Sequence, residues 1–206
     1  MAISTRHRWL NGLLAGTLCV MAACVVQQAS VLMVADWTAS LARQDIVKWS
    51  SKKADHTPEQ WENARRALEA ASARLPQDAT LHDALAQLHS MRGQQLWTTG
   101  AADSPEVAAY EAAIVHQKTS LRVRPTHAMA WANLALMQYA AYEETDTLFA
   151  SWREAARLGP REDDVIETLV YVATEMWPVA PDDVRAWVEV RRPGLSAQLD
   201  AKPAAQ

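Results

Sequence analysis

The stretch Leu121-Arg-Val-Arg-Pro-Thr-His-Ala-Met-Ala-Trp-Ala-Asn-Leu-Ala-Leu-Met137 joins the end of one helical pattern to the start of another. Pro125 cannot lie inside a helix and disfavours helical backbone at the residue before it, so we expect the first helix to end near Val123. Beyond the turn, one face carries residues at the helical spacing i, i+3, i+4 and i+7. These residues are Trp131, Leu134, Ala135 and Gln138. Because this face is mostly apolar or small, it predicts a helix packed against a partner.

The same pattern surrounds Pro76 and Pro160. Each of the three prolines is followed nine residues later by a leucine and preceded five residues earlier by a small residue. The leucines are Leu85, Leu134 and Leu169, and the small residues are Ala71, Ser120 and Ala155. The distance from Pro125 to Pro160 is 35 residues, close to the period of roughly 34 residues of tetratricopeptide repeats, which these units resemble. The first unit is longer, and we place its insertion in residues 94–105.

The chain is predicted to be all-α, because no strand period appears anywhere in it. We expect an N-terminal transmembrane helix followed by a short solenoid of tetratricopeptide-like helical hairpins. Thr57 and Pro58 form a helix start. The expected helices cover residues 58–74, 79–92, 104–123, 127–141, 145–157, 161–176 and 181–191. The predicted division is a leader and anchor (1–36), a stalk and linker (37–56), a helical domain (57–193) and a disordered tail (194–206).

The amino-acid composition is typical of a helical protein and does not favour nucleic acid as a partner. Half of the residues are hydrophobic and only 6 are glycine, which is typical of an alanine-rich helical chain. The formal net charge is −4, and no basic stripe is present. Since nucleic acid is bound through clustered positive charge, it is not an expected partner.

Residues 9–35 are uncharged and predict a membrane-spanning helix, because about 20 apolar residues cross a bilayer. Met21-Ala-Ala-Cys24 is similar to a bacterial lipoprotein cleavage site. Strong hydrophobicity continues past Cys24, however, so we favour an uncleaved anchor over lipidation. Arg6 and Arg8 precede the span, and four basic residues follow it within about 20 positions, so the positive-inside rule leaves the orientation open. We predict a single-pass protein of the bacterial inner membrane with a periplasmic domain.

Several segments together resemble the VpsP-type family of bacterial polysaccharide biosynthesis proteins. They are Ala35-Asp-Trp37, Glu59-Gln-Trp-Glu-Asn-Ala-Arg-Arg-Ala-Leu-Glu69, Leu121-Arg-Val-Arg-Pro125, Trp131-Ala-Asn-Leu-Ala135 and Arg157-Leu-Gly-Pro160. The resemblance covers nearly the whole chain and implies a non-catalytic role in making or exporting surface polysaccharide. It also implies that the partners are membrane or envelope proteins of a polysaccharide assembly machinery.

The residues themselves do not predict an enzyme, a metal site or a cofactor. His82 and His89 are seven residues apart, which is too far for the usual i, i+4 metal pair, so we interpret them as filling space. Acidic residues after Pro160 lie at a helix start, where they favour the helix dipole. The chain has neither a glycine-rich phosphate loop nor a nucleophile elbow, and both cysteines lie in the apolar run.

A solenoid of this kind presents the first helix of each pair along a concave groove, which is the predicted site. By the repeat register the groove residues are Asp83, Gln87, Met91, Ala132, Leu136, Tyr139, Asp164, Glu167 and Tyr171. The alternative function is a membrane-tethered peptide- or protein-binding module of another envelope assembly system. Either reading requires Leu85, Leu134, Leu169, Trp131 and Trp152 to be buried between helices. Replacing Trp131 by alanine would then cost about 3–5 kcal/mol.

Overall fold

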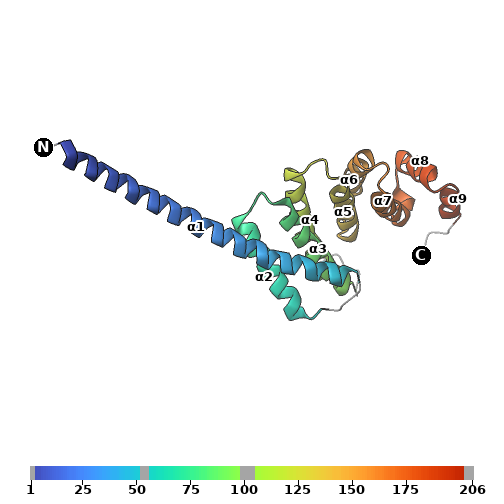
Figure 1. The fold of residues 1–206 in the computed structure, drawn as a ribbon. Coiled ribbons are helices and arrows are strands. Elements are labelled where there is room, and N and C mark those ends of the chain that lie inside the picture. Colours follow the sequence, from blue (N-terminus) through green and yellow to red (C-terminus); the bar gives the residue numbers. More distant parts are fainter. Residues whose placement is uncertain (1–2, 52–55, 98–104, 202–206) are drawn as a thin grey trace.

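The computed structural model describes residues 3–51, 56–97 and 105–201 (Figure 1). Within these ranges every regular element is a helix, so the prediction of an all-α chain is confirmed. The elements are α1 (Ile3–Ser50), α2 (Pro58–Arg74), α3 (Ala79–Leu96), α4 (Pro105–Val123), α5 (Ala128–Ala140), α6 (Thr145–Leu158), α7 (Asp163–Glu175), the 3₁₀ turn η1 (Trp177–Val179), α8 (Asp182–Arg191) and α9 (Leu195–Asp200).

Helix α1 is unbroken over 48 residues and projects from the rest of the molecule at its N-terminal end (Figure 1). Its apolar window is long and hydrophobic enough to cross a membrane, and none of that window is buried inside the molecule. This agrees with the predicted span, since a soluble core helix of the same composition would be covered by other helices.

The C-terminal part of α1 belongs to the folded domain. Ala39, Ala42, Ile46 and Trp49 are buried in one core cluster together with residues of α2 and α3. The structure therefore differs from the predicted stalk over residues 37–56, because the domain core begins inside α1 rather than at residue 57. Residues 52–55 lie outside the described ranges.

Helix α2 begins where the sequence predicts. The Thr57 hydroxyl accepts a hydrogen bond from the Gln60 backbone N–H (3.2 Å), and the Gln60 side chain accepts one from the Thr57 N–H (2.8 Å). This reciprocal pair satisfies two backbone donors that a helix start leaves without partners. Helix α3 extends past the predicted end at residue 92 to Leu96.

The repeat register corresponds to buried positions in three successive units. Its six defining residues are each at most 2% exposed. They are Ala71, Leu85, Ser120, Leu134, Ala155 and Leu169. The small ones let neighbouring helices approach closely, and the leucines fill the space beside them. Burial of the four predicted core residues Leu85, Leu134, Leu169 and Trp152 is confirmed.

Trp131 differs from the expectation because it is only partly buried. Its ring packs against two core clusters, and its indole Nε1 donates a hydrogen bond to the Pro125 carbonyl oxygen (2.8 Å). This bond gives the indole N–H a partner in the turn before α5. The rest of the ring is covered only in part by the neighbouring helices. Because less apolar surface is buried than expected, replacing Trp131 by alanine should lower the free energy of unfolding by less than the amount expected for a fully buried ring.

The segment predicted as a disordered tail contains a short helix, α9. Leu195 and Leu199 pack against the C-terminal core cluster, and the Trp177 Nε1 donates a hydrogen bond to Asp200 Oδ1 (2.8 Å). Gly194 precedes the helix with φ of 83°, a backbone geometry that glycine adopts without strain. These contacts order the segment through residue 200, and residues 202–206 lie outside the described ranges.

Three histidines stack between α3 and α4. The ring centroid of His116 lies 5.6 Å from that of His82 and 5.6 Å from that of His89. Burial, together with the neighbouring His89 and His82, lowers the pKa of His116 to about 4. Burial also lowers the pKa of His89. The folded protein therefore favours neutral imidazoles at this helix contact.

This cluster predicts that the protein loses stability in mild acid. In the unfolded chain histidine titrates near pH 6.5, above the folded pKa of His116, so the unfolded state binds more protons as the pH falls. The free energy of unfolding should then be fully present above about pH 6.5 and decline below it. Thermal unfolding at neutral pH and near pH 5 measures the decline. His116→Gln should reduce it, and an unchanged decline in that variant would contradict the assignment.

Candidate functional site

A pocket of about 320 Å³ opens between α3 and α5, with Gln117 contributed by α4. Four of the nine predicted groove residues line it, namely Asp83, Gln87, Met91 and Leu136. Their side chains come from two helices that are not consecutive in the chain, as the repeat register requires. The structure therefore brings the first part of the predicted groove together.

The lining of this pocket is rich in amides and in flexible apolar side chains. The amides are Gln87, Gln94, Gln117 and Asn133, and the apolar residues include Met91, Met129, Leu136 and Met137. An amide side chain both donates and accepts hydrogen bonds, as a peptide bond does. Methionine adapts its shape to different apolar side chains. This arrangement suits an extended polypeptide better than a small charged ligand.

Asp83 is committed to internal contacts. Its carboxylate accepts a hydrogen bond from Gln117 Nε2 (3.1 Å) and forms an ion pair with Arg124. These contacts tie α3 to α4 and to the turn before α5. The negative charge of Asp83 is thus largely neutralised by Arg124, and its carboxylate holds the pocket wall in position.

The next part of the predicted groove runs over α5 and α7. The rings of Tyr139 and Tyr171 meet edge to face with centroids 6.3 Å apart, and the Tyr139 hydroxyl donates a hydrogen bond to Glu175 (3.2 Å). Burial and the nearby Glu175 carboxylate raise the pKa of Tyr139 to about 12. Asp164 and Glu167 are exposed on α7 before Tyr171. Burial and Glu175 also raise the pKa of Tyr171, so both tyrosines stay protonated beside an acidic surface.

Ala132 does not face the groove, and its assignment there is wrong. It is 0% exposed and packs in the core cluster formed with α6 and α7. Its neighbour Asn133 lines the pocket instead. One residue along a helix turns the side-chain direction by about 100°, so an offset of one position moves a residue from the groove to the core.

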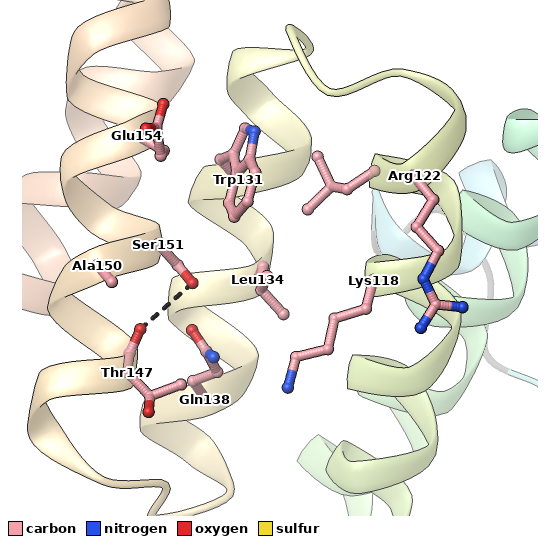
Figure 2. A pocket seen from close by; sticks show the side chains of 10 residues that line it. Lys118, Arg122, Trp131, Leu134, Gln138, Thr147, Ala150, Ser151 and Glu154 are labelled. Carbon is pink, nitrogen blue, oxygen red and sulfur yellow. Dashed lines mark hydrogen bonds between the residues drawn. The ribbon is translucent and has the colours of Figure 1, made fainter.

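A second pocket lies on the opposite face of α5, where sequence reasoning predicted only core packing. Figure 2 shows it between α4 and α6, with α5 forming the floor. Its volume is about 490 Å³. The lining residues are Lys118, Leu121, Arg122, Trp131, Leu134, Gln138, Thr147, Ala150, Ser151 and Glu154. The partial exposure of Trp131 is explained by this pocket, which its ring helps to line.

The described residues contain no constellation typical of metal chemistry. Within residues 3–51, 56–97 and 105–201, no three His, Cys, Asp or Glu side chains gather in a way that could hold a metal ion. The His82 and His116 Nδ1 atoms lie 3.3 Å apart, at hydrogen-bonding distance when one ring donates and the other accepts. These two ring nitrogens can therefore serve as each other's hydrogen-bonding partners.

Neither the protein-family models nor the curated proteins compared with this sequence give a match. What the chain binds is therefore inferred from the chemistry of its two pockets and from the apolar helix that precedes them.

Proposed function

We propose that this chain is a membrane-anchored, tetratricopeptide-like scaffold that holds a partner protein in bacterial exopolysaccharide biosynthesis or export. One observation carries the binding part of this proposal, namely the amide- and methionine-lined pocket between α3 and α5. Two non-consecutive helices hold its walls in place, so an extended segment meets a preformed surface and loses less entropy on binding. The polysaccharide part rests on the resemblance described from the sequence.

The solenoid assignment is supported by the agreement between the repeat register and burial. Equivalent positions before and after Pro76, Pro125 and Pro160 are buried in all three units. Helices α3 and α4 run antiparallel, since His82 faces His116 near one end and Gly93 approaches Tyr110 near the other. Repeating hairpins of this kind bury a continuous core and expose a groove.

We place the protein in the bacterial inner membrane, with one span and a periplasmic domain. The continuity of α1 supports an uncleaved anchor, because its apolar stretch leads directly into the buried Ile46 and Trp49. Cleavage before Cys24 would leave an exposed apolar face on the remaining helix, including Val25, Val26 and Met33. Such a face is stable in lipid and costly in water.

The partners in this proposal are other membrane or envelope proteins of the polysaccharide machinery, and the chain itself performs no catalysis. The alternative is the same type of groove serving a different envelope assembly system. The direct connection between α1 and the domain favours partners that stay at the membrane in either case, because no long linker separates the apolar helix from the core.

Deletion of the coding sequence tests the polysaccharide assignment. We expect polymer output to fall while each glycosyl-transfer step, assayed separately in membrane extracts, retains its rate. Unchanged polymer output would contradict the polysaccharide assignment and favour the alternative, a scaffold of a different envelope assembly system. Loss of one transfer step, or glycan synthesis or cleavage by the purified chain, would contradict the non-enzymatic proposal.

A further inference from the structure

Helix α5 separates two binding-sized pockets. Met129, Asn133 and Leu136 face the groove shared with α3. Trp131, Leu134 and Gln138 face the pocket between α4 and α6 (Figure 2). At about 100° per residue the two sets fall on opposite sides of the helix, so a molecule in one pocket does not block the other.

The floor of the second pocket is apolar and preformed. Leu121 and Leu134 are 5% and 2% exposed and sit beneath the opening. The Trp131 ring lines the same floor, and its hydrogen bond to the Pro125 carbonyl fixes its orientation. A volume of about 490 Å³ lies within the usual range for ligand pockets. One large apolar side chain of a partner can therefore leave water here without rearranging the domain.

The two walls of the pocket differ in charge. Lys118 and Arg122 stand one turn apart on α4 (Figure 2). The Lys118 Nζ atom lies 3.7 Å from Glu143 Oε1 and forms an ion pair with it. Arg122, in contrast, forms no ion pair with any residue that the structure describes. The opposite wall carries Glu154, which is already paired with Arg157 at 2.7 Å. The wall formed by α4 thus has positive charge that no carboxylate in the described ranges balances.

We propose that this pocket is a second docking site, taking a partner segment that inserts one large apolar side chain and presents an Asp or Glu to Arg122. The apolar floor recognises the first feature, and the unbalanced α4 wall recognises the second through a charge-assisted hydrogen bond. The inference builds on the proposed scaffold function, because two pockets on opposite sides of α5 let one anchored domain hold two segments together.

Selection from a random peptide library on the full-length protein in lipid nanodiscs tests this site. Peptides that depend on the pocket should combine Leu, Ile, Phe or Trp with a nearby Asp or Glu. For these peptides Arg122→Glu should weaken binding by about tenfold or more, because it turns an attraction into a repulsion. Ala150→Trp should also abolish binding by filling the opening, without changing any charge.

Two controls separate this site from the groove. Arg161→Glu makes the same charge change on an exposed residue outside both pockets and should leave binding unaltered. Leu136→Arg should remove groove-dependent peptides and retain pocket-dependent ones, so failure of the groove proposal is distinguishable from failure here. The second site is refuted if no selected peptide responds to Arg122→Glu and Ala150→Trp, or if the responding peptides contain no acidic residue.

Discussion

Replacing Trp152 by alanine should lower the free energy of unfolding by about 3–5 kcal/mol, the usual cost of removing a large buried aromatic side chain. Trp152 is 2% exposed, and its ring meets Trp187 edge to face at 4.9 Å between centroids. Its Nε1 donates a hydrogen bond to the Leu169 carbonyl oxygen (2.9 Å). The substitution therefore opens a cavity between α6, α7 and α8 and leaves a buried carbonyl without this donor.

Trp131→Ala is the matched control for this prediction. Because Trp131 is only partly buried, its replacement should lower the free energy of unfolding by about half as much. The reason is that this stabilisation scales with the apolar surface that a side chain buries on folding. Urea unfolding followed by circular dichroism on the full chain measures both variants. Equal losses, or a larger loss for Trp131, would contradict the packing described for these two rings.

Leu136→Arg should abolish complementation of the polymer defect in a deletion strain. The substitution places a charge beside the methionines that line the α3–α5 pocket, where a bound segment would have to desolvate it. Leu136 also packs against the core cluster, so a modest loss of stability accompanies this change. Tyr139→Ala removes the contacts with Tyr171 and Glu175 and should act in the same direction.

Gln87→Arg separates binding from stability in this prediction. Gln87 lines the same pocket and is exposed, so its replacement leaves the core untouched. It should match Leu136→Arg in polymer output while keeping the helix content and protein level of the parent. A Gln87→Arg protein with full activity beside an inactive Leu136→Arg protein would show that the latter fails through folding.

The helical hairpins could be predicted because prolines and small residues recur at fixed distances from each other. Pro76, Pro125 and Pro160 end helices for local steric reasons, and these local signals agree with the long-range packing. That the C-terminal part of α1 packs into the domain core was harder to predict. Its buried face contains Ala39 and Ala42, whose small side chains give a weak hydrophobic signal, while the conspicuous Trp37 is 68% exposed.

The pockets were less predictable than the helices. The groove register located Leu136 and Met91 correctly but chose Ala132 instead of Asn133, since repeat spacing alone does not fix the helix rotation. The second pocket depends on how far α4 and α6 stand apart above α5, which no residue pattern specifies. The formation of α9 was equally hard to predict, because it involves a hydrogen bond between the distant residues Trp177 and Asp200.

Co-purification from membranes tests the central claim, that the anchored domain acts by holding a partner in its groove. The full-length protein, Gln87→Arg, Leu136→Arg and the control Arg161→Glu would be isolated from the native host, and the accompanying proteins quantified. We predict that at least one envelope protein accompanies the parent and Arg161→Glu and is lost from both groove variants. Retention of every partner by both groove variants, together with full polymer output, would contradict the account.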